Sequence, residues 1–217
     1  MKKQPRQHRS RDMVATLLEA AAQEIAARGL AETTTNHVAA RAGVSIGSLY
    51  QYFDDKDAII EELLRRDTAR LLAVVDAHVG GLLDADPRQL TRTLLEIACD
   101  AIEANPTQRE LARNWQSLRS HAAFVTLEQR LTEISRRYIL RHHQEYRIED
   151  LPAALFVGIH AMLYTVAHFM SLEDPPITRA QMITSLTDML SASLFASRDM
   201  PPIKRKKPVK TARKRRT

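Results

Sequence analysis

The chain has 217 residues, of which 44% are hydrophobic and 27% are charged, and its formal net charge is +6. This length is sufficient for a buried core, and the single cysteine, Cys99, excludes an intramolecular disulfide. Polar residues follow the basic N-terminus where a signal peptide needs an apolar run, and the composition predicts no segment that approaches the length of a membrane span. We therefore expect a cytoplasmic protein with no membrane partner.

The positive charge is concentrated at the two ends of the chain. Residues 204–217 contribute +9 and residues 1–11 contribute +5, which leaves −8 for residues 12–203. This pattern predicts an acidic folded body with a basic disordered arm at 1–10 and a basic disordered tail at 201–217. Such ends either lie along a polyanion or serve only solubility.

Apolar residues recur at spacings of three and four with no sustained alternation, which predicts an all-α protein. The first predicted domain, residues 11–55, contains three helices. The first helix follows Ser10 and ends at Gly29, and the threonines at 33–35 open a short second helix that ends at Gly43. Helices this short require packing against a third element.

The second predicted domain, residues 56–200, begins with a long helix that is capped by Asp54 or Asp55 and broken at glycines 80 and 81. Proline is favoured in the first turn of a helix, so three residue pairs mark later helix starts: Asp86–Pro87, Asn105–Pro106 and Leu151–Pro152. Further helices are predicted within 116–143, at 152–172, which is apolar almost all round, and at 178–197.

Residues 34–56 have the layout of a helix-turn-helix whose recognition helix covers about 45–53. Val38 packs the first helix, Gly43 forms the turn, and Leu49 with Phe53 anchors the second helix. The residues that remain exposed suit contact with base edges in a major groove: Ile46, Gly47, Ser48, Gln51 and Tyr52.

This stretch, AxxAGVSxGxLYxYFxxK, resembles the signature of TetR-family transcriptional regulators. The resemblance covers about residues 11–60. It implies a three-helix N-terminal helix-turn-helix domain, joined by a long helix to a C-terminal helical domain that binds a ligand and dimerises. It also implies a ligand-responsive repressor that acts as a homodimer on a palindromic operator in double-stranded DNA.

The resemblance assigns phosphate contacts to Thr35, Tyr50 and Lys56. The rest of the predicted DNA-binding set is Thr34, Ser45, Ile46, Gly47, Ser48, Gln51 and Tyr52. The chemistry agrees, because hydroxyls and an ammonium suit phosphate and Gln51 suits adenine. The alternative for Tyr50 and Tyr52 is a packing role.

A ligand pocket for an unidentified small-molecule effector is predicted around five residues: Trp115, His121, Phe124, His160 and Tyr164. The alternative for His160 and His168 is a place in the core or an interface, with local partners. The two most apolar helices, the last two, are expected to form the dimer interface through seven residues: Leu155, Ile159, Met162, Met182, Leu186, Met189 and Leu190.

The sequence contains no nucleophile elbow at a strand-to-helix turn, no phosphate-cradling glycine loop and no pair of histidines one helical turn apart. We therefore expect no enzymatic activity, no cofactor and no metal. The rival to a ligand-responsive repressor is an architectural protein whose basic arms coat DNA with little sequence preference and without a small-molecule effector.

Overall fold

The computed structural model describes residues 4–116, 118, 121–143 and 150–194. Within these ranges the chain forms nine helices and no strand, which confirms the predicted all-α class. The N-terminal domain contains α1 (Gln4–Glu32), α2 (Thr35–Arg41) and α3 (Ile46–Leu49). The second domain contains α4 (Lys56–Leu82), α5 (Pro87–Glu103), α6 (Pro106–Arg113), α7 (His121–Arg141), α8 (Leu151–Ser171) and α9 (Arg179–Leu194).

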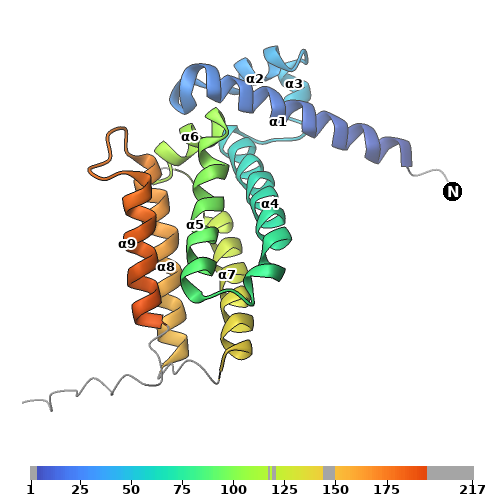
Figure 1. The fold of residues 1–217 in the computed structure, drawn as a ribbon. Helices are drawn as coiled ribbons and strands as arrows, with labels where there is room; N and C mark the ends of the chain where they lie inside the picture. Colours follow the sequence, from blue (N-terminus) through green and yellow to red (C-terminus); the bar gives the residue numbers. More distant parts are fainter. Residues whose placement is uncertain (1–3, 117, 119–120, 144–149, 195–217) are drawn as a thin grey trace, which may run out of the picture.

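The N-terminal domain lies across one end of a helical bundle (Figure 1). The bundle is built from α4, α5, α7, α8 and α9, and the short helix α6 lies between the bundle and α1. A long helix, α4, leaves the N-terminal domain and runs down the bundle, as the sequence predicts for the connecting helix.

Side-chain caps fix most of the helix starts. Asp55, rather than Asp54, caps α4 by accepting a hydrogen bond from the backbone N–H of Ala58 at 2.7 Å. The proline of each predicted pair lies in the first turn of its helix. The residues that cap these helices are Asp86, Asn105 and Asp150. A short polar side chain that accepts an otherwise unpaired N–H explains why these starts are readable from sequence.

Two boundaries differ from the prediction. The first helix begins at Gln4, so residues 4–10, predicted to be a disordered arm, have a helical backbone. Extending an existing helix costs little, and Pro5 fits in a first turn. The long helix α4 also continues through Gly80 and Gly81 to Leu82. Neither glycine has a positive φ, and burial of Val79 and Leu82 offsets the low helix propensity of glycine.

Three apolar clusters form the core. The first contains residues of the three N-terminal helices and of the first part of α4, and it also includes Leu111 of α6. The second joins α4, α5, α7 and α8, and the third joins α5, α8 and α9 and contains the fully buried Cys99. Helix α4 therefore belongs to the cores on both sides of the domain boundary, while α6 contributes Leu111 to the N-terminal core.

Helix α8 corrects the expectation about membrane-length segments. Among the described residues it is the one helix long and apolar enough to cross a membrane by length and composition. It contains no Asp, Glu, Lys or Arg, and it packs against α5, α6, α7 and α9 while leaving Phe156 and Val157 exposed. Apolar residues thus occupy both its packed face and its outer face.

The predicted tail, 201–217, lies outside the described residues.

Candidate nucleic-acid interface and ligand cavity

The turn between α2 and α3 is fixed by backbone and side-chain hydrogen bonds. Gly43 has a φ of +69°, which favours glycine, and the Val44 N–H donates to the carbonyl of Ala39 at 3.0 Å. The Ser45 Oγ accepts from the Ser48 N–H at 3.1 Å and thereby caps α3. The hydroxyl of Ser45, which is in the predicted DNA-binding set, is therefore already used to begin the helix.

The recognition helix is shorter than the predicted range of about 45–53. Its regular part is Ile46–Leu49, and residues 50–52 form a turn. The Phe53 N–H still donates to the carbonyl of Leu49 at 3.1 Å, and the Phe53 side chain is buried. The regular helix ends early because the Phe53 side chain is buried in the core and Asp55, two residues later, already caps α4.

The outer face of this segment presents small, polar and aliphatic groups. Ile46, Gly47 and Gln51 are exposed, and half of the Tyr50 side chain is accessible. The Tyr50 hydroxyl lies 3.2 Å from the Oγ1 of Thr35 at the start of α2. Two predicted phosphate contacts that are 15 residues apart in sequence thus form one hydroxyl pair at the edge of the recognition helix.

Nothing inside the chain requires glycine at position 47. Its φ is not positive, and a Cβ added there would meet no atom closer than the Ser45 Oγ at 3.9 Å. The absence of a side chain instead leaves the backbone of α3 open to close approach from outside. The predicted set therefore contains one residue whose identity the fold does not explain.

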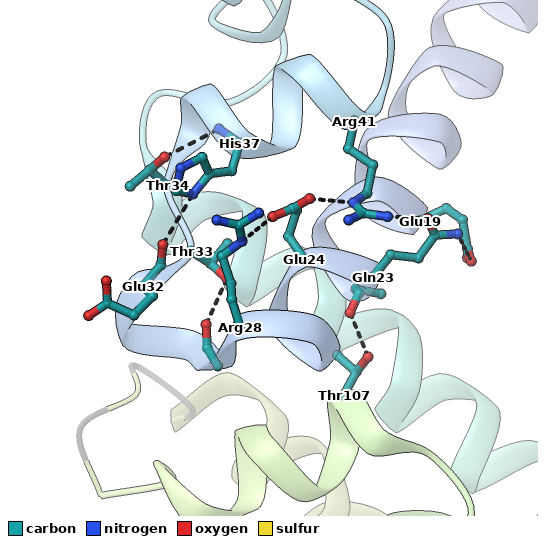
Figure 2. Close-up of polar contacts among 12 residues, drawn as sticks. Glu19, Gln23, Glu24, Arg28, Glu32, Thr33, Thr34, His37, Arg41 and Thr107 are labelled. Carbon is teal, nitrogen blue, oxygen red and sulfur yellow. Dashed lines mark hydrogen bonds and ion pairs between the residues drawn. The ribbon is translucent and has the colours of Figure 1, made fainter.

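Three other predicted DNA contacts have partners within the chain. Tyr52 is half-buried against the core of the N-terminal domain, in agreement with the packing alternative. The Nζ of Lys56 donates to the carbonyl of Leu30 at 3.1 Å and is partly buried. Thr34 caps α2, its Oγ1 accepting from the N–H of His37 at 3.2 Å (Figure 2).

A buried carboxylate, which the sequence analysis did not single out, holds α2 against α1 (Figure 2). Glu24 of α1 forms ion pairs with Arg41 of α2 and with Arg28 of α1, the second at 2.5 Å. The hydrogen bond from Arg41, reinforced by Arg28, holds the pKa of Glu24 below its ordinary value. The spacing of Glu24 and Arg28 was readable from sequence, whereas the contact with Arg41 required the fold.

Helix α6 makes two polar contacts with the backbone of α1. The Thr107 Oγ1 donates to the carbonyl of Ala22 at 2.8 Å. The Glu110 Oε1 accepts from the N–H of Leu30 at 3.0 Å, where Gly29, with a φ of +82°, breaks the helix. This N–H needs a partner from another element because the break removes it from the helical pattern. The second domain therefore supplies the group that completes α1.

A cavity of about 300 Å³ lies inside the second domain, between α4, α5, α6, α7 and α8. Trp115 and Phe124 line it, and their ring centroids are 5.9 Å apart. Tyr164 completes an aromatic cluster, 5.7 Å from Trp115 and 5.5 Å from Phe124, but it does not line the cavity. His160 is also outside the lining and packs on Phe156, while the side chain of His121 lies outside the described residues.

The predicted dimer-interface residues are mostly inside the protomer, which corrects that prediction. Five of them are buried: Leu155, Ile159, Met182, Leu186 and Leu190. Met162 is half-buried, and Met189 alone of the seven is exposed. The predicted interface consists of the most apolar helical positions, and a protomer buries such positions in its own core first. Among the described residues, the exposed large apolar side chains of α8 and α9 are instead Phe156, Val157, Tyr164 and Met189.

Residues 17–63 match the family model described as bacterial regulatory proteins, tetR family. The matched range includes α2, α3 and the first part of α4. It therefore contains the whole exposed face described above and confirms the resemblance drawn from sequence.

Curated relatives match over longer stretches than the family model does. The chain is 34% identical over 119 residues to the "HTH-type transcriptional repressor KstR2" of Mycobacterium tuberculosis, covering 52% of this chain and 56% of that protein. It is 36% identical over 89 residues to the protein of the same name from Rhodococcus jostii, covering 41% and 43%. The chain thus spans about half the length of the curated relatives it matches.

Solved structures match over nearly the whole described chain. A TetR-family transcriptional regulator from Pectobacterium atrosepticum superposes with a TM-score of 0.66 at 20% identity, covering 88% of this chain and 98% of that one. The fatty acid degradation regulator FadR of Bacillus halodurans superposes with a TM-score of 0.62 at 16% identity, covering 88% and 96%. At these identities the likeness shows the fold.

Proposed function

We propose that this chain, whose residues 17–63 match the tetR family of bacterial regulatory proteins, is a transcriptional repressor that binds operator DNA through α2 and α3. The observation that carries the proposal is the exposed face of the matched range, where Ile46, Gly47 and Gln51 lie beside the Thr35–Tyr50 hydroxyl pair. Gln51 suits adenine, Ile46 suits a thymine methyl, and the hydroxyl pair suits a phosphate.

The repressor acts as a homodimer on a palindromic operator. Two copies of α3 related by two-fold symmetry read two half-sites, which lie about one turn of the DNA double helix apart or a multiple of that distance. The exposed apolar residues of α8 and α9 support dimerisation through these helices, since a patch of this kind on a protomer marks an interaction surface. Burial of the outer face of α8 by a second copy also agrees with a soluble protein in the cytoplasm.

The cavity is the site of the small-molecule effector, and two helices connect it to the DNA-binding domain. Helix α4 lines the cavity with Thr68 and Leu71 and packs Ile59 and Leu63 into the N-terminal core. Helix α6 lines the cavity with Gln108 and Leu111 and holds α1 with Thr107 and Glu110. A ligand that displaces either helix changes the separation of the two recognition helices.

The full chain, incubated with a random library of duplex DNA and carried through repeated rounds of selection, tests the proposal. We expect an inverted repeat to be enriched.

On a panel of operator variants, Tyr50→Phe should weaken binding to every duplex by a similar factor, because it removes a phosphate contact. Gln51→Ala should relax preference at one base pair per half-site, by about 1–3 kcal/mol. Failure to enrich any sequence, or uniform loss with Gln51→Ala, contradicts base reading by α3 and the turn that follows it.

A further inference from the structure

The walls of the cavity are largely apolar. Aliphatic side chains from α4, α5, α7 and α8 line it, among them Leu71, Val75, Leu94, Leu127 and Leu163. Contact with such walls stabilises an occupant in proportion to the apolar surface that it removes from water.

The charged groups at the cavity neutralise one another. The Asp67 carboxylate accepts a hydrogen bond from the Gln108 amide of α6 and pairs with Arg70 at 3.2 Å. The side chain of Asp67 is largely withdrawn from solvent, and this burial raises the pKa of its carboxyl above the ordinary value. Asp67 would therefore repel an anionic ligand, and Arg70 would repel a cationic one. Neither ligand would find an unpaired charge of opposite sign among the described lining residues.

One hydrogen-bond donor in the cavity wall has no partner. The indole Nε1 of Trp115 is buried and makes no hydrogen bond to any described residue. Buried indole N–H groups are usually paired, and leaving one unpaired costs free energy. Trp115 lines the cavity, but its Nε1 has no open surface there, so a ligand oxygen becomes the partner of this N–H when the indole ring turns toward the occupant.

We infer that the effector is an uncharged, predominantly apolar molecule that carries one hydrogen-bond acceptor, such as a ketone or an ether, placed beside Trp115 in the cavity between α4 and α8. This inference rests on the proposed function, because it gives the chemical class of the ligand that the repressor detects. The apolar skeleton fills the aliphatic part of the cavity.

The absence of charge is tested with two fluorescent probes that share one ring system. N-phenyl-1-naphthylamine is uncharged, and 8-anilinonaphthalene-1-sulfonate is the same skeleton with a sulfonate. We expect the uncharged probe to bind the full chain saturably and at least tenfold more tightly than the sulfonate. It should also quench the emission of Trp115, the chain's single tryptophan. Equal or tighter binding of the sulfonate overturns the inference.

Binding is assigned to the cavity with a filling variant and a matched control. Ala101→Phe places a ring among the lining residues, whereas Ala77→Phe places the same ring on an exposed position of α4. We expect Ala101→Phe to abolish probe binding and Ala77→Phe to retain it. If Ala101→Phe does not give a cooperative thermal transition, Ala167→Leu, which also fills the cavity, replaces it. Unchanged probe affinity in a folded filling variant overturns the assignment.

The acceptor is tested by displacing the uncharged probe with two compounds of similar shape. 2-Acetylnaphthalene carries a ketone where 2-ethylnaphthalene has a methylene. We expect the ketone to displace the probe at a lower concentration from the unmodified chain, and this preference to disappear in Trp115→Phe. A ketone preference that is absent, or that persists without the indole, overturns the role of Trp115.

The DNA selection described above distinguishes failure of this inference from failure of the proposed function. A chain that enriches an inverted repeat but prefers the sulfonate probe remains a repressor with a different class of effector. A chain that binds the uncharged probe but enriches no sequence retains the cavity assignment and loses the proposed function.

Discussion

Gly47 has no side chain on a surface where most neighbours have one, and the fold gives no internal reason for it. Gly47→Ala should leave the free energy of unfolding unchanged or raise it by about 0.5–1 kcal/mol, because alanine favours a helix. The same change should weaken operator binding at least tenfold, about 1.4 kcal/mol, because the methyl group opposes close approach of DNA. Urea unfolding and gel-shift titration measure the two effects. Unchanged operator affinity would place Gly47 away from the DNA.

The residues of the interface show what a sequence pattern can and cannot give. The motif predicted which segment is exposed, because apolar anchors such as Val38 and Leu49 leave the remaining positions outside. It did not predict that Thr35 and Tyr50 meet, or that Lys56 donates to Leu30. Those contacts join separate elements, so they depend on the angle between helices rather than on spacing within one.

The contact between α1 and α2 depends on the ionisation of Glu24. Because the Arg41 and Arg28 guanidiniums lower the pKa of this carboxyl in the folded chain, its contribution to stability is present above the ordinary value of 4.5. That contribution is lost as the pH falls below 4.5 and through the lower folded pKa. Glu24→Gln should therefore destabilise the chain at pH 7 and lose less stability between pH 5 and pH 3.

Urea unfolding at fixed protein concentration from pH 7 to pH 3 measures this difference. Glu19→Gln, on the exposed side of α1, is the matched control and should retain the pH dependence of the unmodified chain. Parallel pH profiles for Glu24→Gln and the unmodified chain would show that the Glu24 cluster does not contribute to acid sensitivity.

The contact between α6 and α1 depends on an acceptor rather than on a charge. Glu110→Ala leaves the Leu30 N–H without its partner, so we expect it to lower the free energy of unfolding by about 1–3 kcal/mol. Glu110→Gln retains an oxygen that can accept this bond and should cost less. Thermal unfolding of the two variants makes the comparison. A larger loss with Gln than with Ala would contradict the capping of the α1 break.

At the level of elements, helix starts were more predictable than the connections between helices. Local caps such as Asp55 and Asp86 act within one turn, so sequence reveals them. The extension of α1 back to Gln4 and the passage of α4 through two glycines were not readable, because tertiary burial and helix propagation outweigh local propensity. The role of α6 as a bridge depends on contacts between residues 80 and 85 positions apart in sequence.

For the whole molecule, the proposed dimer is expected to form through the outer faces of α8 and α9. Phe156→Glu and Met189→Glu place a charge on exposed apolar positions, so we expect folded monomers that bind operator DNA weakly. Val74→Glu, at an exposed apolar position of α4, is the control and should stay dimeric. Leu186→Glu should instead unfold the protomer, since Leu186 is buried. Sedimentation velocity distinguishes these outcomes, and intact dimers in both Phe156→Glu and Met189→Glu would locate the interface elsewhere.

The global arrangement explains why the interface residues were misplaced by sequence. Periodicity showed that 152–172 is apolar almost all round, but it could not show which side of the helix the protomer covers. Packing of α8 against four other helices assigns Leu155 and Ile159 to the core and leaves Phe156 and Val157 outside. Hydrophobicity alone does not separate a core face from an interface face.

The central claim is that α3 reads DNA sequence, and the ratio of two affinities tests it most directly. The affinity of the full chain for the selected inverted repeat is measured against its affinity for a scrambled duplex of the same composition, over a series of salt concentrations. A sequence-reading repressor should prefer the repeat by about 10³-fold or more at physiological salt, and the preference should persist as salt weakens both complexes. A ratio near one at every salt concentration would contradict the claim and would favour an architectural protein that binds DNA through its charge.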